Sequence, residues 1–302
     1  MIESKEVTIH VGLHKTATTF LQSEFFHLYS NELGYVNLRK DMREFLYYVL
    51  FCNDLDYDSQ EATRLFLTKL KDANTINRKI LLSDEQFCGS PWDNAVSRKR
   101  YFDRLNVIFP NAKYIIVLRN QEEMVRSLYL QYIKTGGSAT WKEFLSHKTH
   151  PLSFGLKSYL NYGAYINYMV KLVGIERVGC FFYEDMQKNT QIFLANIAKF
   201  AGFKLLDETT NIIGRRKNPS ITYPWLKFLL FANKFFRSYR EPFLLFPQSM
   251  HLLIVKLIIK MPPSTKKVFI PKQEVSSFCE EAKRNNSIIK KIYSRDISEI
   301  GY

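Results

Sequence analysis

Residues 7–19 decide the fold of this chain, and they read Val-Thr-Ile-His-Val-Gly-Leu-His-Lys-Thr-Ala-Thr-Thr. The first five are rich in β-branched side chains and predict a short, buried strand. Gly12 ends this run, and the hydroxyl side chains after it predict a helix over residues 16–26. A strand, a tight loop and a helix are therefore expected in direct succession.

The loop between this strand and helix has the chemistry of an anion-binding site. Free backbone N–H groups and the helix dipole face a ligand there, and Lys15 adds a full positive charge. A Walker A loop needs the pattern G-x-x-x-x-G-K-[ST], but Lys15 follows Gly12 by only three residues and no second glycine is present. An ordinary ATP or GTP site is therefore not expected. The alternative is that Thr16, Thr18 and Thr19 only cap a helix.

Three more short apolar runs, at residues 79–82, 113–118 and 177–182, each end in polar side chains. Short apolar strands that alternate with helical patterns indicate a parallel sheet covered on both faces. The expected fold is α/β, a P-loop-like three-layer sandwich with a central parallel sheet flanked by helices, plus a C-terminal helical region. In such sheets ligands bind at the carboxyl ends of the strands, so one site is predicted at that edge.

Arg119 directly follows the apolar run at residues 113–118. Ser127 lies about two turns along the helix predicted for residues 121–134. A guanidinium at a strand end suits bidentate contact with a phosphate, and the serine hydroxyl can donate to the same group. The alternative is an ion pair between Arg119 and Glu122 or Glu123.

The composition excludes several classes of protein. The chain has 302 residues, 46% hydrophobic and 24% charged, which is typical of a folded protein and not of a disordered or low-complexity one. Its four cysteines show no C-x-x-C pair and no histidine at ligand spacing, so we expect reduced thiols and no metal site. No secretion signal or membrane span is recognised.

The net charge of +14 is unevenly distributed. Residues 1–211 hold 26 basic and 23 acidic side chains, whereas residues 212–302 hold 17 and 6. The charge balance changes near residue 211, so we predict a core over residues 1–211 and a basic, aromatic-rich helical part over 212–302 that completes the same domain. This basic part has three alternative interpretations: it binds an anionic substrate, a membrane surface or a nucleic acid.

Two of these motifs together resemble the sulfotransferases that use 3′-phosphoadenosine 5′-phosphosulfate (PAPS). The first is HVGLHKTATTFLQ, similar to the family loop G-x-x-K-[ST]-[GA]-[ST]-[ST], and the second is VLRNQEEMVRSLYLQY, with the family's Arg and a Ser eight residues later. YLNYGAYINYMVKLVGIERVGCFFYEDM and AKRNNSIIKKIYSRDI are weaker matches. Ala17 departs from the glycine of many members, and no adenine-binding segment is recognised.

The resemblance implies roles for named residues. The 5′-phosphosulfate would be held by the loop residues Gly12, Leu13, His14, Lys15, Thr16, Ala17, Thr18 and Thr19. Arg119 and Ser127 would hold the 3′-phosphate, and Arg216 and Lys217 are candidates for the loop that closes over it, unless that loop is only solvated. The family needs no metal.

The transfer also needs a group that accepts the acceptor's proton. Lys15 would stabilise charge on the leaving oxygen, and Glu85 is the first candidate for the base, before Asp84 and His14. Glu85 could instead be only a carboxylate at a helix N-terminus, and His14 could contact sulfuryl oxygens or have no role. Glu184 and Asp185 are expected to be structural.

The expected function is sulfuryl transfer from PAPS to a hydroxyl or amine of a carbohydrate or glycolipid. The alternatives are a P-loop-like nucleotide or small-molecule kinase and a basic protein that binds a membrane surface or nucleic acid. Apolar and basic residues over 225–260 predict either contact with an anionic membrane or a helical cover for the acceptor cleft. We expect a cytoplasmic protein, with membrane contact at the inner face as one option, and no nucleic-acid partner.

Overall fold

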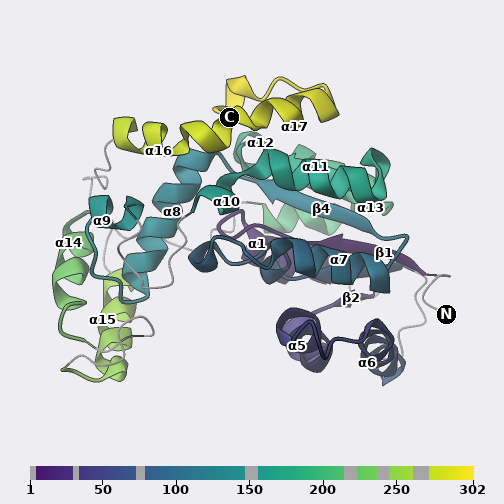
Figure 1. The fold of residues 1–302 in the computed structure, drawn as a ribbon, viewed down its shortest axis with the longest axis horizontal. Coiled ribbons are helices and arrows are strands. Elements are labelled where there is room, and N and C mark those ends of the chain that lie inside the picture. The colour runs from purple at the N-terminus through teal and green to yellow at the C-terminus, as the bar shows by residue number, and fades with distance from the viewer. Residues whose placement is uncertain are drawn as a thin grey trace.

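Five parallel strands form one sheet in the order β2-β3-β1-β4-β5 at the centre of the chain (Figure 1). They are β1 (Glu6–His10), β2 (Tyr35–Val36), β3 (Lys79–Ser83), β4 (Lys113–Leu118) and β5 (Val178–Phe182). The structure is a computed structural model, and it describes residues 5–29, 34–72, 79–146, 156–213, 223–236, 238, 245–260 and 272–302. The predicted parallel α/β sandwich is confirmed.

The strand positions agree with the predicted runs to within one residue at each end. β3 and β4 lie on either side of β1, with Ile9 opposite Leu82 and His10 opposite Ile115. Val, Ile and Leu dominate these central strands because both faces of the sheet are buried. The edge strand β2 was not predicted, since two residues are too few to make a recognisable pattern.

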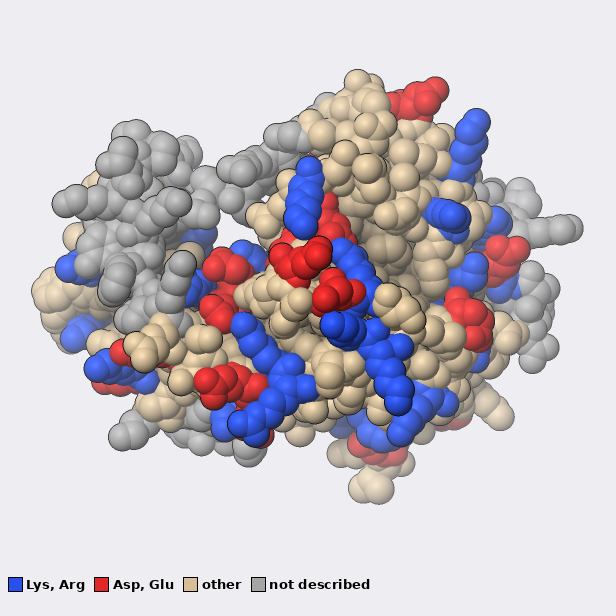
Figure 2. All heavy atoms as spheres, turned by 90° about the horizontal axis from the view of Figure 1, so that it is seen from above, with Lys and Arg blue, Asp and Glu red and all other residues tan. Residues whose placement is uncertain are grey.

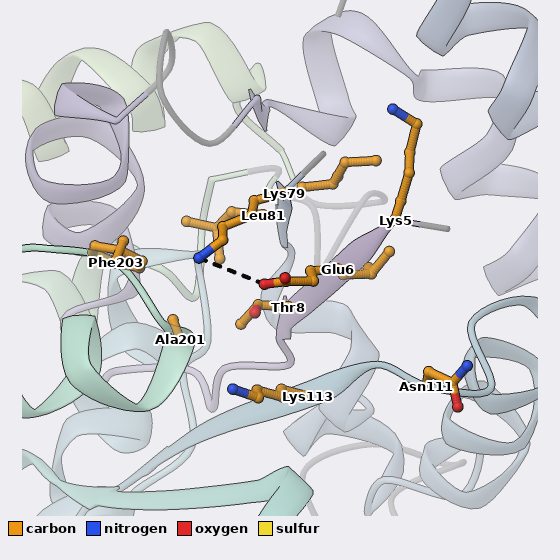
Figure 3. Close-up of a pocket in the computed structure, with 11 residues that line it drawn as sticks. Lys5, Glu6, Thr8, Lys79, Leu81, Asn111, Lys113, Ala201 and Phe203 are labelled. Atoms are coloured by element: carbon orange, nitrogen blue, oxygen red, sulfur yellow. Dashed lines mark ion pairs between the residues drawn. The ribbon is translucent and has the colours of Figure 1, made fainter. Parts of the chain in front are cut away.

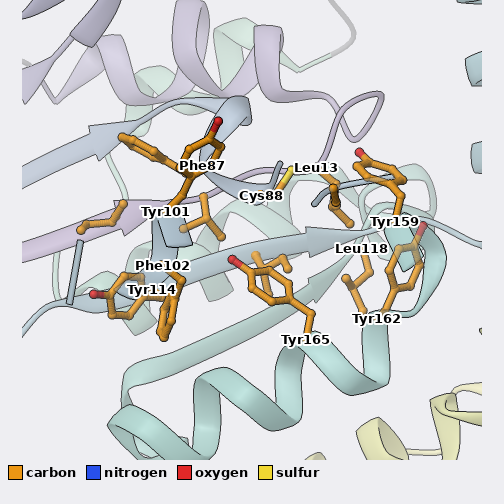
Figure 4. Packing of buried hydrophobic residues seen from close by; sticks show 14 of the residues in the cluster. Leu13, Phe87, Cys88, Tyr101, Phe102, Tyr114, Leu118, Tyr159, Tyr162 and Tyr165 are labelled. Carbon is orange, nitrogen blue, oxygen red and sulfur yellow. The ribbon is translucent and has the colours of Figure 1, made fainter. Parts of the chain in front are cut away.

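Helices cover both faces of the sheet, so the molecule has three layers (Figure 1). Leu81, Ile115 and Val117 face one layer, formed by the helices after β1 and by α13 (Thr190–Ala201). The alternating strand residues face the other layer, whose helices are α5 (Arg43–Phe51), α6 (Ser59–Asp72), α7 (Arg98–Ile108) and α11 (Tyr162–Val173). Tyrosines and phenylalanines fill much of this second core (Figure 4).

The first helix begins later than predicted. It comprises α1 (Thr18–Phe20), a π-helical turn η1 (Leu21–Phe25) and α2 (Phe26–Leu28). Lys15 and Ala17 have φ angles of 64° and 62°, and a right-handed helix cannot start through such residues. The loop is therefore longer than the sequence suggested.

Helix α8 (Gln121–Lys134) was predicted with correct bounds. Its N-cap residue Asn120 accepts from the backbone N–H groups of Glu122 and Glu123, and a lysine stands in its last turn. The remaining helices up to residue 213 are short: α4 (Leu38–Asp41), η2 (Glu85–Cys88), η3 (Pro91–Asp93), α9 (Trp141–Leu145), α10 (Lys157–Leu160), η4 (Ile175–Arg177), α12 (Tyr183–Lys188) and η5 (Asp207–Ile212).

The C-terminal part folds into helices that contact the first 211 residues. They are α14 (Tyr223–Ala232), α15 (Gln248–Lys260), α16 (Lys272–Arg284), α17 (Asn286–Tyr293) and η6 (Ser298–Ile300). Buried Asn286 exchanges hydrogen bonds with Gln121 of α8, and the Tyr293 hydroxyl donates to the carbonyl of Val178 on β5. These contacts join α17 to the edge of the sheet and to α8.

Part of the C-terminal positive charge is neutralised by acidic partners. Lys283 pairs with Glu122 at 2.7 Å and Arg295 with Asp185 at 2.6 Å. Figure 2 shows acidic and basic side chains interspersed on the face seen from above Figure 1. The excess positive charge of residues 212–302 therefore does not form one uninterrupted basic surface on this face.

All four cysteines are free thiols, as expected. Within the described ranges, no helix combines the length and apolar character needed to cross a bilayer.

Candidate active site

The loop after β1 lies at the carboxyl edge of the sheet, between β3 and β4. Gly12 also has a positive φ, of 47°, so three residues of the loop adopt the left-handed conformation. Alternation of this kind turns successive N–H groups toward one concavity, the arrangement that binds anions. Only Gly12 adopts it without cost, and Lys15 and Ala17 carry backbone strain.

Two threonine hydroxyls hold the loop closed. Thr16 and Thr18 both donate to the carbonyl oxygen of Leu13, at 2.6 and 3.1 Å, and both are buried. Leu13 itself packs into the core (Figure 4). The structure thus gives these hydroxyls a direct role in shaping the loop, while Thr19 is exposed at the helix start.

The buried side chain of Tyr159 holds His14 in place. Its backbone N–H donates to the hydroxyl of Tyr159 at 3.0 Å, and its Nδ1 lies 3.3 Å from the same oxygen. Tyr159 is held in turn by Arg98, which donates to its carbonyl and lies over its ring. Burial, with the charges of Lys15 and other cations, lowers the pKa of His14 to about 4.

The side chain of Lys15 points toward α8. Its Nζ donates to Oε1 of Gln131 at 3.2 Å. Burial lowers the pKa of its ammonium group, Glu85 opposes this effect, and Arg119 adds to it. Lys134, one turn further along α8, also has a lowered pKa through burial and through the charge of Lys15. Gln131 and Lys134 are site residues that the sequence analysis missed.

Arg119 connects the two predicted motifs. Its Nη1 donates to the carbonyl oxygen of Lys15 at 3.0 Å, and its guanidinium lies over the ring of Tyr183. Its Nε is buried and has no partner in the described part of the chain. A cation with an unused donor, held against the loop, is suited to binding an anion.

A cavity of about 380 Å³ opens beside Arg119. Arg126 also lines it, and the buried Nε of this second arginine has no hydrogen-bond partner among the described residues. Glu123 lies 3.9 Å from Arg119 and 3.7 Å from Arg126, so its carboxylate is the nearest anion to both. Ser127 follows Arg126 on the helix, is partly buried and does not line the cavity. Ser127 stays a prediction, and Arg126 is a further residue of this cavity that was not predicted.

The candidate bases follow β3 at the same edge. Burial raises the pKa of Glu85, nearby Asp84 raises it further, and Arg39 and Lys15 oppose the shift. Glu85 is also the first residue of η2, as the structural alternative supposed. Asp84 is fully buried, caps this helix and forms a two-bond ion pair with Arg39 at 2.7 and 3.0 Å. Asp84 is thus already engaged by Arg39 and by its helix cap. Glu85 is the carboxylate whose negative charge acts on the ammonium group of Lys15.

A second histidine at this edge was not singled out by the sequence analysis. His10 ends β1, and its Nδ1 lies 2.8 Å from Ser83 Oγ, which also receives a hydrogen bond from Gln22. Its Nε2 is buried without a partner among the described residues. A Cβ on Gly12 would come within 3.1 Å of the His10 ring, so the loop packs directly on it. Burial lowers the pKa of His10 to about 3.

The remaining predicted residues fall into two groups. Glu184 accepts from the backbone N–H of Asn120 and from the Tyr302 hydroxyl, and Asp185 pairs with Arg295, which agrees with the structural roles expected for both. Arg216 and Lys217 lie outside the described residues. In the described ranges, no group of three or more His, Cys, Asp or Glu residues is placed to hold a metal ion.

Another cavity, of about 390 Å³, lies at the opposite, amino edge of the sheet (Figure 3). Its lysines have structural partners. Lys79 donates to the carbonyl of Gly202 at 2.6 Å and pairs with Glu6, while Lys113 donates to the carbonyl of Phe200. Helix α13 ends here, and cations are favoured at a helix C-terminus. These lysines therefore cap a helix and lie at the opposite edge from the Lys15 loop.

Comparisons with known proteins identify the family and the fold. The family model described as Sulfotransferase domain matches residues 8–217. Among solved structures, a sulfotransferase from Alicyclobacillus acidocaldarius is 14% identical, with 98% of each chain covered and a TM-score of 0.57. The sulfotransferase domain from the curacin biosynthetic pathway is 13% identical over 94% of this chain and 97% of its own, with a TM-score of 0.47.

Mouse sulfotransferase SULT7A1, complexed with PAP, is 13% identical over 95% of this chain and 89% of its own, with a TM-score of 0.41. No curated protein matches the chain in sequence.

Proposed function

The chain belongs to the sulfotransferase family and is a PAPS-dependent enzyme, and on this premise we propose that its acceptor is a hydroxyl or amine of a carbohydrate or glycolipid. The observation that carries the site assignment is the hydrogen bond from Arg119 to the carbonyl of Lys15. It joins the loop expected to hold the 5′-phosphosulfate to the residue expected to hold the 3′-phosphate. Two anionic ends of one donor would thus be held by one connected set of cations.

Lys15 has the position and charge to assist the transfer. The sulfur–oxygen bond to the donor phosphate breaks while a new sulfur–oxygen bond to the acceptor forms, and negative charge grows on the leaving phosphate oxygen. An ammonium group held in advance, here by Gln131, stabilises such charge without having to reorganise. The other backbone N–H groups of residues 13–18, apart from that of His14, which donates to Tyr159, would share this task.

Glu85 is the proposed base. The proton of the acceptor hydroxyl would pass to its carboxylate as the oxygen attacks sulfur. Its raised pKa makes it a better proton acceptor than an ordinary surface carboxylate. Asp84 is committed to Arg39 and to its helix cap, so we assign it a positioning role.

The polar character of the site's surroundings supports a hydroxylated acceptor. Gln131, Lys134 and the half-exposed Arg39 all lie near Lys15 or Glu85. Such side chains can hydrogen-bond the several hydroxyls of a sugar, whereas a purely apolar alcohol offers them only one polar group. The polar side chains around Lys15 and Glu85 therefore favour a carbohydrate or glycolipid over a steroid-like acceptor.

The test is release of adenosine 3′,5′-bisphosphate (PAP) from PAPS in the presence of an acceptor panel. The panel contains oligosaccharides, glycolipids, a phenol and a sterol, each checked for covalent sulfate by mass spectrometry. We expect sulfation of a sugar hydroxyl or amine and a loss of at least about 100-fold in turnover for Lys15→Ala. Sulfation of the phenol or sterol alone would overturn the acceptor assignment. Near-normal turnover by a folded Lys15→Ala variant would overturn the role of Lys15.

A further inference from the structure

Helices α14 and α15 and the residues between and beside them present an exposed apolar face. We call this the α14–α15 face. Its apolar side chains are between 36% and 78% exposed. They are Phe228, Phe231, Phe235, Leu245, Phe246, Met250, Leu252, Leu253 and Leu257. The rings of Phe231 and Phe235 contact each other, and the Phe246 N–H donates to the Phe235 carbonyl, so members of the group adjoin one another. Exposed apolar side chains gathered in this way often mark a binding surface.

The charged side chains that the structure describes on this face are all lysines. Lys227, Lys234 and Lys256 are exposed among the apolar residues. The described residues within 223–260 include no Asp or Glu. The α14–α15 face therefore differs from the surface around α16 and α17, where Lys283 pairs with Glu122 and Arg295 pairs with Asp185.

The opposite side of the same helices is firmly packed. Asn233 is fully buried and donates to the carbonyls of Ile133 and Gly137, both at 2.8 Å. His251 of α15 is buried and lies 3.1 Å from the Asn233 amide oxygen. Leu229 of α14 is also fully buried. This network fixes both helices to the end of α8, so the exposed apolar face is a defined surface of the fold.

We propose that the α14–α15 face binds the surface of an anionic lipid bilayer. Aromatic and aliphatic side chains can enter the boundary between headgroups and acyl chains, while lysines contact anionic headgroups. Proline residues and the short lengths of α14 and α15 are compatible with a position along the interface.

Two other occupants fit the face less well. A second copy of the chain would bring lysine against lysine, with no acidic side chain among the described residues of the face to pair with them. A nucleic acid would leave the large aliphatic side chains Leu252, Leu253 and Leu257 without suitable contacts, because affinity for it comes mainly from phosphate contacts. The combination of leucines and lysines favours lipid.

The position of the α14–α15 face relative to the donor loop connects membrane binding with sulfuryl transfer. Gln131, near the end of α8, accepts a hydrogen bond from Lys15, and the carbonyl of Ile133, two residues further on, accepts one from Asn233 (Figure 1 shows α8 reaching α14). One helix thus connects the loop and the membrane-binding face. Docking would place the sulfuryl-transfer edge near the bilayer, where a membrane-held acceptor could reach it. The binding itself does not depend on the acceptor's identity.

Vesicle flotation tests the proposal with the full chain. Phosphatidylcholine vesicles are compared with vesicles that also contain phosphatidylglycerol, at low and high salt. We expect flotation with the anionic vesicles at low salt and weaker flotation at high salt or without phosphatidylglycerol. Absence of flotation with anionic vesicles at low salt would overturn the proposal.

Two sets of substitutions separate the apolar and charged contributions. Phe231→Ser with Leu253→Ser and Leu257→Ser should abolish flotation. Each of Lys227→Gln, Lys234→Gln and Lys256→Gln should weaken partition into anionic vesicles about fivefold, which corresponds to about 1 kcal/mol. PAP binding, measured by calorimetry, should stay unchanged in every variant and shows that the donor site remains folded.

The matched control removes equally exposed apolar residues elsewhere. Phe51→Ser with Leu55→Ser and Val107→Ser removes apolar side chains that are at least 61% exposed and lie on or near α5 and α7. This variant should float like the wild type. Equal loss in the control, or a change of oligomeric state confined to the apolar variant without vesicle binding by the wild type, would overturn the proposal. The second outcome would identify the face as a self-association surface.

Discussion

The guanidinium of Arg119 donates a hydrogen bond to the carbonyl oxygen of Lys15 at 3.0 Å, so a residue after β4 supports the loop after β1. We predict that Arg119→Ala weakens PAP binding about 10-fold to 100-fold, because a charged hydrogen bond to a phosphate contributes about 1.5 to 3 kcal/mol. Turnover should fall as well, since Lys15 loses its support. Calorimetry and steady-state kinetics measure the two effects.

Arg119→Lys gives a sharper form of this prediction. Lysine keeps the charge but lacks the planar set of donors that can reach both a carbonyl and an anion. We therefore expect little rescue of PAP affinity. Wild-type affinity in Arg119→Lys would show that only the charge at this position is used.

Glu123 lies between the two arginines of the 380 Å³ cavity, 3.9 Å from Arg119 and 3.7 Å from Arg126. An incoming phosphate would compete with this carboxylate for the same donors. We predict that Glu123→Gln tightens PAP binding about twofold to fivefold, a modest effect because the side chain is half-exposed and screened. Glu176→Gln, just before β5, is the control and should leave the affinity unchanged. Weaker binding by Glu123→Gln would assign the carboxylate to ligand binding instead.

The sequence was sufficient to predict the features that local patterns encode. The strands around Ile9, Leu81 and Ile115 are short apolar runs, and α8 carries both an N-cap and charges that match its dipole. It was also sufficient to place Lys15 and Arg119 at one edge, because parallel strands end together.

Contacts between segments that lie far apart in the chain could not be predicted from the sequence. Arg126 and Gln131 lie on a helix whose orientation decides which side chains meet the loop, and the sequence pattern alone does not fix that orientation. The support of His14 by Tyr159 spans 145 residues. The late start of the first helix results from the left-handed conformations of Lys15 and Ala17. Only a glycine at these positions would have indicated that conformation from the sequence.

Glu85 as a base makes a prediction for the pH dependence of the reaction. A base must be deprotonated, and the pKa of Glu85 is raised above its usual value of 4.5, so kcat/KM should rise with pH through this shifted value. Glu85→Gln should lower kcat about 100-fold to 10,000-fold with little change in PAP affinity. Loss of PAP affinity with turnover retained would make Glu85 a structural residue.

Arg39→Ala tests the same assignment through a neighbour. The positive charge of Arg39 opposes the rise in the pKa of Glu85, and Asp84 loses its partner when Arg39 is removed. Both changes favour the protonated form of Glu85. The acid limb of the kcat/KM profile should therefore move to higher pH. An unchanged profile in a folded Arg39→Ala variant would argue against Glu85 as the titrating base.

Two buried histidines predict how stability depends on pH. Burial lowers the pKa of His10 to about 3 and that of His14 to about 4, from 6.5 in the unfolded chain. The unfolded chain therefore binds more protons below pH 6.5, and each histidine destabilises the fold as the pH falls from 6.5 toward these values. The loss is about 1.4 kcal/mol per pH unit for each histidine. The raised pKa of Glu85 acts in the opposite direction, so the wild type must be compared with variants.

Urea unfolding of the wild type, His10→Gln and His14→Gln between pH 7 and pH 4.5 measures the contribution of each histidine. Each variant should lose stability less steeply than the wild type over this range, because the group that the unfolded chain protonates is gone. Parallel slopes for all three proteins would mean that His10 and His14 are protonated as readily in the folded chain as in the unfolded one, and that neither is held neutral beside the loop.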